Sequence, residues 1–135
     1  MRTRLSLAVV CLCLPVVAIT GCIGHLLATP GHRQGLSLHD KRLTNLDVSA
    51  CTNLKGLGCS GNQLAALDVS SCTNLRSLDC SQNSITDLSS LVANAFLGGL
   101  GTGDMVVLSG NPLSAFARTN QIPILRSLGA TVCWP

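Results

Sequence analysis

Four cysteines recur in two pairs at a fixed spacing, and they are the residues with the clearest chemical potential. Cys72 follows Cys51 at the same offset, twenty-one, at which Cys80 follows Cys59. Stacked repeats bring such positions to about 4.8 Å, within reach of a disulfide, but parallel Cβ vectors fit the required dihedral poorly. A zinc site is disfavoured, since no C-x-x-C spacing is present. The spacing favours small buried hydrophobic side chains, with a bridge within either pair as the alternative.

Three histidines follow one another at seven-residue spacing, at His25, His32 and His39. This spacing suits a metal site on a helix, but Pro30 and Gly31 break any helix there. A cysteine hydrolase needs a reactive thiol beside a base, and the histidines lie in or beside a segment expected to be a solvated tether. We therefore predict no catalytic residue, no metal and no cofactor.

The N-terminal segment has the layout of a secretory signal. Two arginines within the first four residues precede an almost wholly apolar run from Leu5 to Thr20. That run is shorter than the roughly 20 residues of a transmembrane helix, and Pro15 interrupts it. We predict a signal peptide over residues 1–21 and a tether over residues 22–35.

The end of this segment, Ile19-Thr20-Gly21-Cys22, resembles the lipobox of bacterial lipoproteins. That motif has an aliphatic residue, two small residues and the cysteine whose thiol receives the lipid. The resemblance implies lipidation of Cys22 and an exported protein anchored at the cell envelope, on the outer membrane where the organism has one. Acyl chains hold a protein on a bilayer because each buried CH₂ contributes about 0.8 kcal/mol. Ordinary signal cleavage nearby and an uncleaved anchor are the alternatives.

Two consecutive segments of equal length, 43–63 and 64–84, align without a gap. Within the first, Leu57 and Cys59 alternate with small residues, so both side chains are expected to point inward from a short strand. The first half of each unit, residues 43–53 and 64–74, is too short for a helix and is expected to return in an extended form or a short turn. The apolar positions that recur are Leu43/Leu64, Leu46/Leu67, Val48/Val69, Cys51/Cys72, Leu54/Leu75, Leu57/Leu78 and Cys59/Cys80.

An asparagine recurs where the chain is expected to turn off the strand, at Asn62, Asn83 and Asn111. A side-chain amide at such a bend can satisfy buried backbone groups and form a ladder from one coil to the next. The step from Asn83 to Asn111 is longer by seven residues than the step from Asn62 to Asn83, so this coil carries an insertion of that length. We predict a short helix over Leu88–Leu97 and a loop over Gly98–Gly103 within it.

The two ends of the array depart from the repeat. Residues 36–38 keep the apolar positions, but Lys41 replaces the asparagine, which is typical of a capping coil. At the other end, residues 114–128 predict a helix broken at Pro123 and stopped by a glycine. Residues 130–134 predict a last strand that closes the domain.

Residues 54–64 match the general leucine-rich-repeat pattern, with Cys59 in place of one leucine. The Leu-Asp-Val-Ser and Leu-x-Cys-Ser elements resemble the short repeats of internalin-like bacterial leucine-rich-repeat proteins, some of which have a cysteine ladder. The resemblance extends over roughly residues 36–134.

This resemblance implies an α/β solenoid: a short right-handed coil with a parallel concave sheet and a small C-terminal cap of helix and strand. The leucine-rich-repeat domain would span residues 36–135, with a variant repeat and the cap in residues 85–135. Such proteins generally bind other proteins, which implies a protein partner at the cell surface.

The strand positions between the inward side chains form the face open to a partner. The candidate binding residues are Ser60, Asp79 and Ser81 on this face, with Lys55 and Arg76 at its edge. Binding hot spots are usually Trp, Tyr or Arg, and the face itself has none of them. Its other positions are Gly35, Ser37, His39, Gly56, Gly58, Ser77, Met105, Val107 and Ser109.

Composition narrows the function further. Aromatic residues make up 2% of the chain, so the core must be filled by smaller side chains, which suits thin stacked layers. Without the signal segment, the chain has seven basic and six acidic residues. The basic residues form no patch that would support nucleic-acid binding. We predict a monomeric envelope protein that mediates protein–protein interaction, with a structural or vestigial protein without a dedicated ligand as the alternative.

Overall fold

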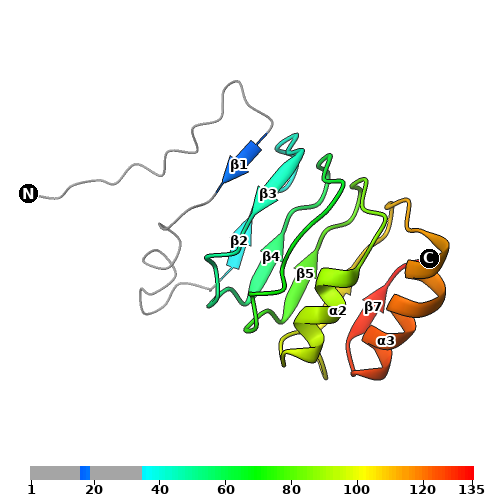
Figure 1. The fold of residues 1–135 in the computed structure, drawn as a ribbon. Helices are drawn as coiled ribbons and strands as arrows, with labels where there is room; N and C mark the ends of the chain where they lie inside the picture. The colour runs from blue at the N-terminus through cyan, green and yellow to red at the C-terminus, as the bar shows by residue number, and fades with distance from the viewer. Residues whose placement is uncertain (1–15, 19–34) are drawn as a thin grey trace, which may run out of the picture.

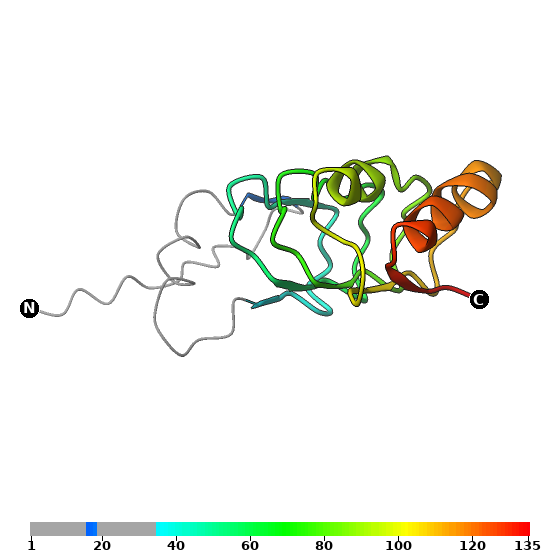
Figure 2. The same cartoon turned by 90° about the horizontal axis from the view of Figure 1, so that it is seen from below.

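A five-stranded parallel sheet forms one side of the molecule, and two short helical segments lie on the other side (Figures 1 and 2). The computed structural model describes residues 16–18 and 35–135. The elements, in chain order, are β1 (Val16–Ala18), β2 (Gly35–Ser37), β3 (Asn45–Asp47), β4 (Gly56–Gly58), β5 (Ser77–Asp79), α2 (Ser89–Phe96), β6 (Met105–Val107), a π-helical segment η1 (Ala117–Gln121), α3 (Ile122–Ser127) and β7 (Thr131–Cys133).

The register of the sheet follows the spacing of the repeat. The strand order is β2-β4-β5-β6-β7, and Leu36, Leu57 and Leu78 are paired neighbours, each one repeat length from the next. Leu78 pairs with Val106, which lies one repeat length and seven further residues along the chain, so the predicted insertion lies between β5 and β6. Each strand thus places one apolar side chain at the same inward position.

The core lies between the sheet and the segments that return to it. Leu57, Cys59, Leu78 and Cys80 are all buried under the strands. Their counterparts from the return segments and helices close the other side of the same cluster. The predicted filling of the core by smaller side chains is confirmed, because the buried cluster consists of Leu, Val, Ile, Ala and Cys, with Trp134 only partly buried against it.

The return segments are extended, as the sequence predicts. β3 lies on this side, and Asp47 at its end pairs with Asp68 of the next coil through an isolated parallel bridge. β1 pairs with β3 in parallel, with Val17 opposite Leu46. β1 therefore takes the place of a return strand before the first described coil, although its residues lie within the predicted signal segment.

The insertion between β5 and β6 contains the predicted helix. α2 is flanked by Leu88 and Leu97 as its capping residues, which confirms a short helix over Leu88–Leu97. Asn94, fully buried in this helix, donates hydrogen bonds to the carbonyl oxygens of Val69 (2.8 Å) and Cys72 (2.9 Å). The helix is thus attached to the preceding coil through a polar contact inside the core.

The C-terminal helical segment differs from the predicted break at Pro123. The chain stays helical from Ala115 to Ser127, and a wide π-helical turn precedes the proline. The N–H of Ile122 donates to the carbonyl of Ala117, five residues earlier. Proline lacks an N–H, and its ring crowds the carbonyl four residues before it. The wider turn is a way to accommodate that crowding without ending the helix.

The stop after this helix and the final strand agree with the sequence. Gly129 has a φ of 98°, and its N–H and that of Ala130 donate to the carbonyls of Arg126 and Leu125. This pair of bonds is the Schellman arrangement, which favours glycine at the left-handed position. β7 follows at once and pairs with β6.

Candidate functional site

The outer face of the five-stranded sheet carries the predicted binding residues. Ser60, Asp79 and Ser81 are half-buried on this face, and Lys55 is exposed directly before β4. The structure therefore brings the first three together on adjacent coils. No other element of the described chain covers this face (Figure 2).

The polar side chains of this face are largely bonded to one another. The Asp79 carboxylate accepts hydrogen bonds from the Ser81 hydroxyl (2.7 Å) and backbone N–H (3.1 Å). The imidazole of His39 is hydrogen-bonded to the Ser60 hydroxyl. His39 is half-buried on the sheet, beyond the predicted tether and on the face where the sequence places it. Its ring lies against Gly58, where a Cβ would come within 2.3 Å of Nε2.

The His39–Ser60 pair does not complete a hydrolase site. Such a site also needs a group that orients the imidazole and donors for an oxyanion. Within residues 35–135, Ser60 is the one hydrogen-bonding partner of His39. The pair fastens the first coil to the second.

The three recurring asparagines are buried and bridge neighbouring coils. Asn83 Oδ1 accepts from the Leu64 N–H (3.0 Å), and its Nδ2 donates to the carbonyls of Cys59 (3.0 Å) and Cys80 (3.1 Å). Asn62 and Asn111 make the corresponding bonds one coil before and after, and both also donate to one of these two carbonyls. The result is a continuous row of shared hydrogen bonds along the edge where each strand ends.

The ladder cysteines are free thiols buried in the core. Cys51, Cys59, Cys72 and Cys80 are each at most 2% exposed. Burial, with a smaller contribution from Asp79, raises the pKa of Cys59 to about 12. Burial, and next the neighbouring Cys51, raises the pKa of Cys72 to about 11. Thiols with such pKa values stay protonated at neutral pH and are poor nucleophiles and metal ligands.

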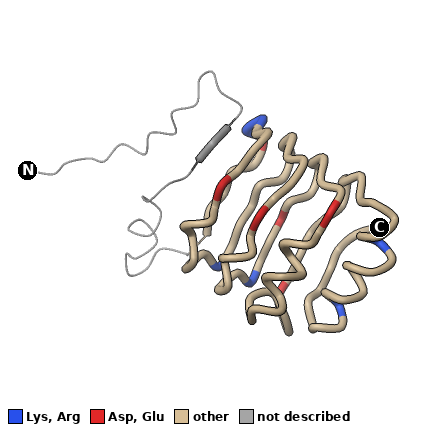
Figure 3. Tube along the Cα trace, in the orientation of Figure 1, with Lys and Arg blue, Asp and Glu red and all other residues tan. Residues whose placement is uncertain are grey.

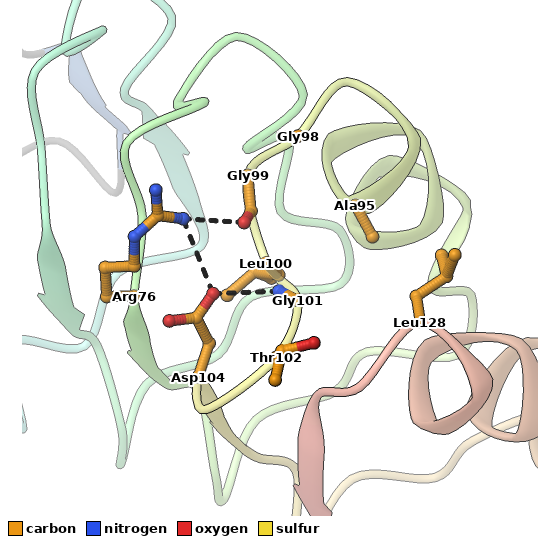
Figure 4. A pocket seen from close by; sticks show the side chains of 9 residues that line it. All are labelled: Arg76, Ala95, Gly98, Gly99, Leu100, Gly101, Thr102, Asp104 and Leu128. Atoms are coloured by element: carbon orange, nitrogen blue, oxygen red, sulfur yellow. Dashed lines mark hydrogen bonds and ion pairs between the residues drawn. The ribbon is translucent and has the colours of Figure 1, made fainter.

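Arg76 lies at the edge of a second feature, a hollow of about 440 Å³ beside the ends of both helices (Figure 4). Its Nη1 donates to the Gly99 carbonyl (2.7 Å) and pairs with Asp104 Oδ2 (3.4 Å). The same carboxylate oxygen accepts from the Gly101 N–H (2.8 Å). A cation is favoured here because the C-terminal end of a helix carries partial negative charge.

Two predicted features fall outside the described part of the chain. They are Cys22, the predicted lipidation site, and the histidines His25 and His32. Over the described ranges, no helix has the length and apolar character to cross a bilayer. The same ranges hold no group of three or more metal-ligating side chains. Apart from the consecutive residues Asp40, Lys41 and Arg42, the charged residues of the described coils are scattered singly (Figure 3).

Sequence reasoning missed the most exposed apolar side chains. Phe96, Leu97 and Phe116 are 67%, 65% and 61% exposed. The signal that identifies the first two is their position at the end of the predicted helix, directly before two glycines. Cys133, exposed on β7, was missed as well, because its spacing does not follow the ladder.

Comparison with known proteins agrees with this architecture. The family described as Leucine Rich repeats (2 copies) matches residues 52–93, which run from the turn before β4 into α2. The chain therefore contains leucine-rich repeats, a type of domain that is typically non-catalytic and that generally binds proteins. A search of curated proteins found no significant match.

Proposed function

We propose that this chain is a cell-envelope protein whose leucine-rich repeats bind another protein through the outer face of the sheet. In this proposal the coils form a short right-handed solenoid over residues 36–135, with the sheet on its concave side. The observation that carries the proposal is the uncovered face of five in-register strands. Ordered edge-to-edge strands present a rigid surface, and a rigid surface loses little entropy on binding.

The envelope location rests on the sequence. A signal peptide over residues 1–21, a lipid on Cys22 and a tether up to residue 35 would hold the repeats near a membrane. Intact mass spectrometry of the chain from a membrane fraction tests this location. We expect a mature N-terminus at Cys22 that carries lipid, and an unlipidated mature chain that starts elsewhere would contradict it.

Photo-crosslinking tests the binding face. Benzoylphenylalanine placed at Ser77, which is exposed at the start of β5, should give one discrete adduct with an envelope protein. The matched control places the same group at Ala66, which is exposed on the return segment of the same coil. Equal labelling from both positions, or from neither, would reject the face as the binding site.

A structural role without a dedicated ligand is the second candidate. It is favoured by the hydrogen bonds that Asp79 and His39 already make within the face, because such groups offer less to a partner. In that case, no discrete adduct would form from benzoylphenylalanine at Ser77 and Ser77→Trp would leave cell-envelope integrity unchanged, whereas a binding face would give the adduct.

A further inference from the structure

The seven-residue insertion builds the hollow beside the helix ends. In the regular coils, a short turn joins the return segment to the next strand, as at Cys51–Leu54 and Cys72–Leu75. Before β6 this turn is replaced by α2 and the loop 98–104, and the loop supplies most of the lining of the hollow. Insertions into a repeat array fall on one face, which is often the face that binds.

The hollow has an apolar side and a polar side. Ala95 from α2 and Leu128 from the end of α3 line one side, and Arg76 and Asp104 lie on the other (Figure 4). Its volume of about 440 Å³ falls within the range of small-molecule and side-chain pockets. A large apolar side chain can therefore enter next to a charged group.

Two large exposed apolar residues lie, along the chain, between residues that line this hollow. Phe96 and Leu97 are 67% and 65% exposed, and the residues on both sides of this pair, Ala95 and Gly98, line the hollow. The core of the described chain uses neither side chain. Adjacent exposed aromatic and aliphatic side chains, two residues before the Gly99 carbonyl that Arg76 contacts, have the composition of a protein-interface hot spot.

The positive charge of Arg76 beside the hollow indicates that the partner carries a negatively charged group. Arg76 is 51% exposed in its side chain, and its hydrogen bonds to other described residues all leave from Nη1. The rest of the guanidinium fork remains available, and a carboxylate is the group that such a fork binds best. Asp104 is already held by Arg76 and the Gly101 N–H.

We propose that this rim, defined by Arg76, Phe96, Leu97 and the hollow, binds a peptide segment of a partner protein that has a large apolar residue next to an Asp or Glu. The apolar residue enters between Ala95 and Leu128, and the carboxylate meets Arg76. The proposal deepens the proposed protein-binding function and places its strongest contacts away from the sheet face.

A displayed library of random peptides, selected on the full chain, tests the proposal. We expect enriched peptides with a large apolar residue beside Asp or Glu. Synthetic copies, titrated by fluorescence anisotropy, should lose about tenfold or more in affinity on Phe96→Ser, Leu97→Ser or Thr102→Trp. Thr102 is exposed and lines the hollow, so tryptophan there can fill it without disturbing the core.

Two matched controls make the result specific. Phe116 is about as exposed as Phe96, but it follows Ser114, whose backbone N–H donates to the Thr86 carbonyl shortly before α2 begins. Phe116→Ser and the sheet-face variant Ser77→Trp should therefore leave peptide affinity unchanged. Thermal unfolding of each variant shows whether it is folded.

The outcomes separate this proposal from the proposed function. Peptides whose binding is lost on Ser77→Trp but kept on Phe96→Ser would overturn the rim and leave the sheet face as the binding site. Enrichment of no peptide would also overturn the rim, while crosslinking at Ser77 tests the sheet face independently. Peptides without an acidic residue that bind the rim would overturn the role of Arg76.

Discussion

Replacing Asn83 with alanine should destabilise the domain more than any exposed substitution. Asn83 is 7% exposed, and it joins the second coil to the third through its whole amide. Its Oδ1 accepts from the Leu64 N–H, and its Nδ2 donates to the carbonyls of Cys59 and Cys80. The variant removes all these bonds and leaves the strands otherwise intact.

The expected loss in free energy of unfolding depends on which groups keep a hydrogen-bond partner in the variant. The Cys59 carbonyl retains the bond from Asn62, and the Cys80 carbonyl retains the bond from Asn111. The buried Leu64 N–H loses its acceptor, which costs about 1–3 kcal/mol. Two shared bonds disappear as well, each worth about 0.5–1.5 kcal/mol net. We expect a loss of about 3 kcal/mol, a large part of the roughly 5–15 kcal/mol of a typical domain.

Urea denaturation followed by circular dichroism measures this loss. With a slope of about 2 kcal/mol per molar, the midpoint should fall by about 1.5 M. The matched control is Asn74→Ala, since Asn74 is exposed and makes one bond, to the Thr52 carbonyl (2.9 Å). It should change stability by no more than about 0.5 kcal/mol.

The isosteric variant Asn83→Asp checks the argument from the opposite direction. It keeps the acceptor for Leu64 but places a negative charge against two carbonyls inside the core. We expect it to be at least as destabilising as alanine at neutral pH. A loss below about 1 kcal/mol for Asn83→Ala, or equal to that of Asn74→Ala, would refute the ladder as a source of stability.

Three further outcomes follow from the packing. Among the five described cysteines, Cys133 alone should react quickly with maleimide, because it is exposed and the other four are buried. Burial also raises the pKa of Cys59 to about 12, which keeps that thiol protonated. Fast labelling of a ladder cysteine, mapped by peptide mass spectrometry, would contradict the buried position of these thiols. Hydrogen bonds from Ser70 hold the pKa of Asp68 below its usual value. The stability that the ionised Asp68 contributes is therefore present above about pH 4 and is lost as the pH falls through the folded pKa. We expect Asp68→Asn to reduce the fall in urea midpoint on acidification. Gly129→Ala should lower the free energy of unfolding by about 2 kcal/mol or more, because a φ of 98° is strained for alanine and a Cβ would lie 2.8 Å from Thr102 Cα. A Tm within error of that of the wild type would contradict this expectation.

The repeat made the fold predictable, because a fixed spacing of apolar residues dictates both the strand and its neighbour. Leu36, Leu57 and Leu78 could be paired on paper, and the structure pairs them. The insertion could be placed as well, since the step from Asn83 to Asn111 exceeds the regular spacing. In both cases one periodic signal determines local structure and tertiary contact together.

The features that sequence reasoning missed depend on contacts between different coils. His39 binds Ser60, one coil away, and the spacing of the histidines alone gives no indication of that contact. The π-helical turn before Pro123 could not be predicted either. The rule that an internal proline breaks a helix predicts only strain, and a chain can relieve that strain by a break or by a wider turn. Arg76 looked like a flank of the sheet, yet it reaches the Gly99 carbonyl across the inserted loop.

The same contrast explains where function is to be sought in this chain. Positions that recur in every coil are committed to the core, to the asparagine row or to bonds within the sheet face. Stacking needs these positions in each coil, so they carry little information about a partner. Phe96 and Leu97 have no counterpart in the regular coils and no place in the core. An exposed apolar pair that folding does not require is better accounted for by binding, and it occurs where the repeat is interrupted.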